Sequence, residues 1–157
     1  MTSASGEEHQ TQQIIASGEE HQTQQIINAN ALPALVELLS HEDAKMVKEA
    51  CFALSNITAG SQAQVQAVAD AGAMPKLLGL MSSGDLAIRK ESSWAICNAL
   101  SLDGSEVARE LLFSLGAADP LRSLLEWTAD GKLAKAACKG LEALSIGGAI
   151  LGAGGGE

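Results

Sequence analysis

The segment that decides the fold is Lys48-Glu-Ala-Cys-Phe-Ala-Leu-Ser-Asn56, because it returns 42 residues later as Lys90-Glu-Ser-Ser-Trp-Ala-Ile-Cys-Asn98. Segments 31–39 and 73–81 match at the same offset, and a weaker third copy at 115–125 matches 71–81 at an offset of 44. Divergent repeats of about 40–47 residues are typical of armadillo and HEAT proteins. The sequence therefore predicts an all-α armadillo-type solenoid of about three repeats.

Each repeat is expected to contain three helices. In the first repeat these are a short polar helix over 20–28, a second helix with Pro33 in its first turn, and a long third helix over 43–58. The long helix of the second repeat is expected over 85–100, with Pro75 in the first turn of the helix before it. Proline fits a first turn because its missing N–H has no helical partner there. Serines and aspartates before the long helices suit N-caps, and Gly60 and Gly104 suit stops after them.

These signals place the repeats at 18–59, 60–102 and 103–147. We expect segment 1–17 to be helical and either to cap the first repeat or to fray, and the Gly-rich segment 148–157 to be a flexible tail.

The long helices carry two stripes at helical spacing. One stripe is mostly apolar and is predicted to be buried: Met46, Ala50, Ala53, Leu54 and Ile57, then Ile88, Ser92, Ala95, Ile96 and Ala99. The other has an acid, an aromatic ring and an amide at i, i+3 and i+7, which places them on one face: Glu49, Phe52 and Asn56, then Glu91, Trp94 and Asn98.

The second stripe predicts a binding groove for extended basic peptides. An asparagine amide can donate to and accept from a peptide backbone. Aromatic rings can hold the aliphatic stems of lysine and arginine with some cation–π attraction, and carboxylates can meet their charged ends. The alternative is that Phe52 and Trp94 only pack repeats together and that Asn56 and Asn98 cap helix ends.

The third repeat lacks this stripe. At the offset of 44, the equivalents of the second triplet are Lys135, Cys138 and Glu142, a cation, a thiol and an acid. We therefore expect a basic peptide to lie over the first two repeats, and the third repeat to bury the open end of the second.

A family resemblance is carried by the two copies of the motif, the run Ser-Asn-Ile-Thr-Ala-Gly60 after Leu54, and Gly140-Leu-Glu-Ala-Leu144. Through these residues, the sequence over about 18–144 resembles the late armadillo repeats of importin-α (karyopherin-α). This resemblance implies a right-handed superhelix, and a Trp/Asn array that binds nuclear localisation signals. It also implies a place in nuclear import and a cytoplasmic and nuclear localisation. Trp94, Asn98 and Asn56 match the array, and Phe52 replaces a tryptophan.

An exact tandem copy precedes these repeats: Ala-Ser-Gly-Glu-Glu-His-Gln-Thr-Gln-Gln-Ile-Ile fills both 4–15 and 16–27. Identity over twelve residues indicates a recent duplication or deliberate engineering, and we favour an engineered fragment. The extra copy could cover the exposed end of the solenoid, extend the first helix, mediate self-association, or fray. A scaffold without a native ligand is thus the alternative to a peptide-binding adaptor.

Net charge and cysteine content argue against several other classes of ligand and site. A net charge of −9 disfavours nucleic acid and favours basic partners. The three cysteines form no CxxC pair, which argues against a disulfide framework or zinc site and favours a reducing compartment. We expect no secretory signal, membrane span, cofactor, metal site or enzymatic activity, because no corresponding motif occurs.

Overall fold

Helices alone make up the described part of the chain. The computed structural model describes residues 24, 30–101 and 104–154. Over these residues there is no strand, which confirms the all-α prediction. The helices are α3 (Leu32–Leu38), α4 (Ala44–Thr58), α5 (Gln62–Asp70), α6 (Ala73–Leu80), α7 (Leu86–Ala99), α8 (Glu106–Ser114), α9 (Ala118–Trp127) and α10 (Gly131–Gly154).

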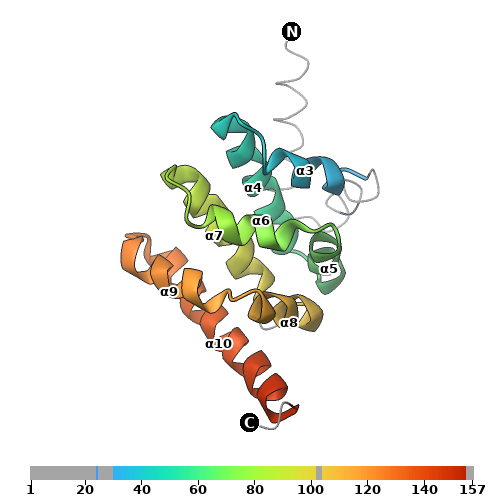
Figure 1. Cartoon of the computed structure of the whole chain (residues 1–157), viewed down its shortest axis with the longest axis vertical. Coiled ribbons are helices and arrows are strands. Elements are labelled where there is room, and N and C mark those ends of the chain that lie inside the picture. The colour runs from blue at the N-terminus through green and yellow to red at the C-terminus, as the bar shows by residue number, and fades with distance from the viewer. Residues whose placement is uncertain (1–23, 25–29, 102–103, 155–157) are drawn as a thin grey trace.

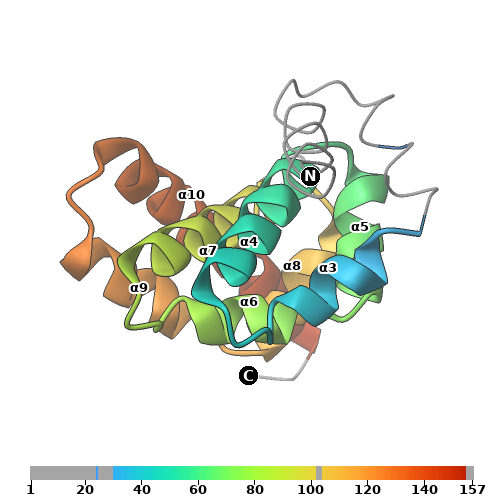
Figure 2. The same ribbon diagram turned by 90° about the horizontal axis from the view of Figure 1, so that it is seen from above.

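The helices form successive units stacked along the long axis of the molecule (Figure 1). Helices α3 and α4 lie in the first unit, α5 to α7 in the second, and α8 to α10 in the third. The long helices α4, α7 and α10 are neighbours, and α7 packs more extensively against α4 than against α10. Seen from above, the short helices α3 and α6 lie along the same side of α4 and α7 (Figure 2). The predicted armadillo solenoid is confirmed.

The long helices begin at an aspartate N-cap, as the loop residues of the first two repeats predicted. Asp43 accepts a hydrogen bond from the Lys45 N–H (3.0 Å), and Asp85 accepts from the Ala87 and Ile88 N–H groups (2.9 and 3.2 Å). In the third unit, Asp130 accepts from the N–H groups of residues 132 and 133 at the start of α10 (2.9 and 3.4 Å). An N-cap satisfies N–H groups that have no partner within the helix.

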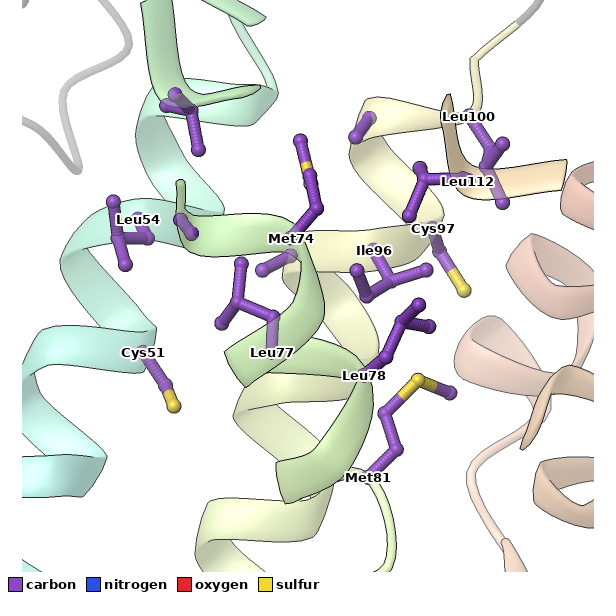
Figure 3. Close-up of a cluster of buried hydrophobic side chains, with 14 of the residues drawn as sticks. Cys51, Leu54, Met74, Leu77, Leu78, Met81, Ile96, Cys97, Leu100 and Leu112 are labelled. Atoms are coloured by element: carbon purple, nitrogen blue, oxygen red, sulfur yellow. The ribbon is translucent and has the colours of Figure 1, made fainter. Parts of the chain in front are cut away.

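One continuous apolar core runs through the three units (Figure 3). The stripe predicted to be buried is buried in both helices, except for Met46. Met46 is half-buried in the first turn of α4, whereas its equivalent Ile88 is 5% exposed, and Val47 beside Met46 is 4% exposed. Met46 has no described helix of a preceding unit against it, which explains the difference.

The third unit covers the second, as expected. In the second helix of each unit, one row of side chains faces the following unit. Met74, Leu78 and Met81 of this row are buried. In the third unit, the residues 44 positions after Leu78 and Met81 are Arg122 and Leu125, and both are exposed. Arg122 pairs with Asp119 on α9, so the outer row of this unit is partly polar.

The predicted tail over 148–157 is wrong through residue 154, because α10 continues to Gly154. Glycine costs about 1 kcal/mol relative to alanine within a helix, but it does not forbid one. Extending a helix that has already begun needs no new nucleation, and alanine, isoleucine and leucine alternate with these glycines.

Several predictions fall outside the described residues. The helical segment 1–17, the twin copies at 4–15 and 16–27, and the polar helix over 20–28 lie there, apart from the helical residue Gln24.

Candidate functional site

The six residues predicted to form the groove lie on two neighbouring helices. Helix α4 carries Glu49, Phe52 and Asn56, and α7 carries Glu91, Trp94 and Asn98. All six are half-buried. Because α4 and α7 pack side by side along their lengths, the structure brings the two triplets together.

The asparagines do not cap helix ends. The Asn98 Nδ2 group donates to the backbone carbonyl of Ser55 on α4 (2.9 Å). The Asn56 Nδ2 group donates instead to the Phe52 carbonyl within its own helix (3.1 Å). An amide has two N–H donors and a carbonyl acceptor. Asn56 and Asn98 therefore each keep an N–H donor and the Oδ1 acceptor for a ligand.

A polar contact that the sequence did not lead us to expect fixes α4 against α7. The Thr58 Oγ1 atom lies 3.0 Å from the Ala95 carbonyl oxygen and 3.1 Å from that of Ser55, so both share its proton. The Ser55 carbonyl also accepts from the Ala59 N–H (3.2 Å) and from Asn98. Thr58 is only 1% exposed, and a buried hydroxyl needs a partner. That requirement is the signal that could have revealed this contact from the sequence.

The acidic members of the face lie among lysines. Burial raises the pKa of Glu91 above its usual value, the charges of Lys90 and Lys48 lower it, and that of Glu49 raises it. Lys48 and Glu49 thus act on Glu91 from the neighbouring helix. Sequence reasoning singled out the glutamates and overlooked these lysines.

A cleft of about 580 Å³ opens beside this face, where the ends of α4 and α7 meet the first half of α10. Among the six predicted residues, only Asn98 lines it. The cleft extends into the third repeat, which the sequence did not suggest. Its lining is Thr58, Ala59, Gly60, Val65, Cys97, Asn98, Ser101, Gly104, Ala136, Lys139 and Glu142.

The structure corrects the register assigned to the third repeat. The cap Asp130 lies 45 residues after Asp85, because the segment from Gly116 to Asp130 is one residue longer than its equivalent from Gly72 to Asp85. In the first turns of α10, the equivalents of Glu91 and Trp94 are therefore Ala136 and Lys139, not Lys135 and Cys138. The conclusion that this repeat lacks the acid and the ring is unchanged.

An aromatic contact ties the second and third units together at their edge. The Arg89 guanidinium lies 4.7 Å from the ring centroid of Trp127, and its Nε donates to the Ser83 carbonyl (3.1 Å). A cation over an indole face at this distance is attractive. This chain therefore already uses a tryptophan to hold a basic side chain.

Stacked helical units with a polar and aromatic face along the long helices define an armadillo-repeat solenoid. The armadillo/beta-catenin-like repeat family matches residues 19–59 and 61–101, and the chain belongs to this family. No curated protein matches the sequence. No helix in the described ranges is long and apolar enough to cross a membrane.

Solved structures of designed proteins share this fold. One designed armadillo repeat protein is 32% identical, with a TM-score of 0.78 over 85% of this chain and 55% of its own. Another, in complex with the peptide (KR)4, is 34% identical, with a TM-score of 0.74 over 85% of this chain and 54% of its own. An engineered protein is 31% identical, with a TM-score of 0.78 over 87% of this chain and 54% of its own. The chain thus spans about half the length of these structures.

Proposed function

We propose that this chain binds extended basic peptides, of the type found in nuclear localisation signals, across α4 and α7. One observation carries the proposal. Asn98 lies one helical turn after Trp94 on α7, and its amide is held in place by the hydrogen bond to the Ser55 carbonyl. The fixed amide offers a remaining donor and acceptor to a peptide backbone, and the half-buried ring offers a surface to a basic side chain.

Two further facts support a basic ligand. The (KR)4 complex of a designed relative shows that this fold can hold a basic peptide. The raised pKa of Glu91, with burial as its first cause, indicates a carboxylate in a poorly hydrated place, where a cation is attracted more strongly than in water. A role as an import adaptor, and a cytoplasmic and nuclear localisation, extend the proposal from the resemblance to importin-α. The proposed role is binding and not catalysis.

A fluorescence titration with the (KR)4 peptide tests the proposal. Trp94→Leu keeps an apolar side chain in the half-buried position but removes the ring, so we expect binding to weaken by about 2- to 30-fold. Phe113→Leu is the matched control, because Phe113 is 41% exposed on α8, away from α4 and α7. Equal affinities for wild type and Trp94→Leu would contradict the assignment of this face.

A repeat scaffold without a native ligand is the second candidate, favoured by the exact duplication and by the likeness to designed proteins. The same titration separates the two, because a bare scaffold binds neither (KR)4 nor a neutral peptide of equal length. We do not extend the proposal to self-association through the third repeat, since Arg122 and its partner Asp119 place charge on that outer row.

A further inference from the structure

The long helix of the third repeat presents a different charge pattern to the groove. At the position of Lys48 and Lys90 it keeps a lysine, Lys135. The glutamate that follows in the first two repeats is replaced by Ala136. The aromatic position is occupied by Lys139. The repeat therefore keeps the cation and loses both the carboxylate and the ring.

The lysines of α10 form a row on one side of the helix. Lys132, Lys135 and Lys139 follow at i, i+3 and i+7, a spacing that places them on one face. All three are exposed, and no ion pair involves their ammonium groups within the described ranges. Of the three, Lys139 is the one that lines the cleft between α7 and α10.

The cleft has room and polar groups for a length of peptide. Its volume is about 580 Å³, and it is lined by Asn98 of α7 and by Ser101 just after α7, together with Ala136 and Lys139 on α10. Among the described residues, Glu142 is the one carboxylate of its lining. Because Asn98 also belongs to the proposed peptide-binding face, a peptide that contacts this amide can continue into the cleft without a break.

We propose that the cleft between α7 and α10 selects peptides in which acidic residues adjoin the basic run, and that Lys139 is the residue that sets this preference. This inference rests on the proposed peptide-binding function and specifies its ligand further. A purely basic peptide would bring its cations against Lys139 once it passes Asn98. A peptide with glutamates at that point instead places opposite charges together.

The experiment compares peptides of equal length on the full chain at low ionic strength. Each carries an alternating Lys-Arg run extended by two glutamates or by two glutamines, at either end, because the direction of the peptide is not assumed. We expect one glutamate-extended peptide to bind about two- to five-fold tighter than its glutamine counterpart, a gain typical of exposed charge pairs. The gain should fall in high salt.

Variants of Lys139 then test the residue assignment. Lys139→Gln should abolish the preference, and Lys139→Glu should reverse it in favour of the purely basic peptide. The control Arg122→Gln removes the same charge from α9, which contributes no residue to the cleft, and should leave the preference intact.

The outcomes separate this inference from the function on which it rests. Binding of the basic run through Trp94, with equal affinities for glutamate and glutamine extensions, overturns the inference and leaves the proposed function standing. A preference that survives Lys139→Gln also overturns the inference. If no peptide carrying the basic run binds, the proposed function fails and this inference fails with it.

Discussion

Replacing Thr58 by valine tests whether side-chain hydrogen bonds between repeats stabilise the solenoid. Thr58 is 1% exposed at the end of α4, and its hydroxyl reaches the carbonyls of Ala95 and Ser55 at 3.0 and 3.1 Å. Valine has nearly the same shape, so the substitution removes the hydroxyl and leaves the packing largely in place.

The expected cost follows from the groups left behind. The Ser55 carbonyl still accepts from the Ala59 N–H and from Asn98 Nδ2, so no buried acceptor is orphaned there. The loss is then that of an ordinary net hydrogen bond, about 0.5–1.5 kcal/mol, and not the larger cost of an unsatisfied buried group. For a chain of this size, 1 kcal/mol corresponds to about 2–4 °C in Tm.

Urea and thermal unfolding, followed by circular dichroism, measure this cost. A double-mutant cycle with Asn98→Ala adds a sharper criterion, because both side chains donate to the Ser55 carbonyl. We expect a coupling free energy of about 0.5 kcal/mol or more between them. If Thr58→Val unfolds at the wild-type urea concentration and temperature, the hydroxyl adds no net stability and the reasoning is refuted.

Three further measurements address charge, backbone and thiols. The pKa of Glu91 is raised in the folded state, so just above the usual glutamate pKa the native protein holds more protons than the unfolded chain, and the contribution of Glu91 to stability falls as pH rises through that window. Glu91→Gln should therefore flatten the pH dependence of the urea midpoint in this window. An unchanged pH dependence would disprove the assignment to Glu91. Gly79 is helical and has open space around its Cβ position, so Gly79→Ala should raise the free energy of unfolding by about 0.5–1 kcal/mol. Gly72 also has open space but lies at φ +84°, so Gly72→Ala should lower the free energy of unfolding by about 1–2 kcal/mol. Equal shifts in the two urea midpoints would argue against this backbone explanation. A thiol reagent at neutral pH should modify the exposed Cys138 in the native chain and spare the two buried cysteines, whose pKa burial raises to about 12; mass spectrometry showing more than one adduct would count against this.

The sequence predicted most of the fold because repeat packing constrains it at many positions at once. The period located the units, and the aspartates before α4 and α7 located the first turns of these two helices to within a residue. The apolar stripe identified the buried side of α4 and α7. These signals are local or repeat in register, so each position is supported by its equivalents.

The sequence predictions were wrong or incomplete where the spacing between repeats changed, where a segment has no equivalent in another repeat, or where a feature depends on contacts between units. The segment between Gly116 and Asp130 has one extra residue, which shifted the groove positions from Lys135 and Cys138 to Ala136 and Lys139. Glycines after position 146 suggested an irregular tail, whereas α10 continues through them. The bond from Thr58 to Ala95 crosses between repeats and leaves no pattern in a single helix.

The third repeat shows that packing and ligand chemistry occupy different sides of one helix. On the packed side of α10, a Cβ added at Gly140 would lie 3.3 Å from the Leu100 Cδ1 atom and 3.4 Å from that of Leu121, so this side approaches α7 and α9 closely. A larger residue there would displace two fully buried leucines. On the cleft side, the exposed Lys139 stands where α7 has the half-buried Trp94, so the core does not require an apolar side chain at this position. The fold therefore restricts the first side strictly and leaves the second free to change, which is why the choice of ligand must be inferred from the cleft side chains and not from the solenoid itself.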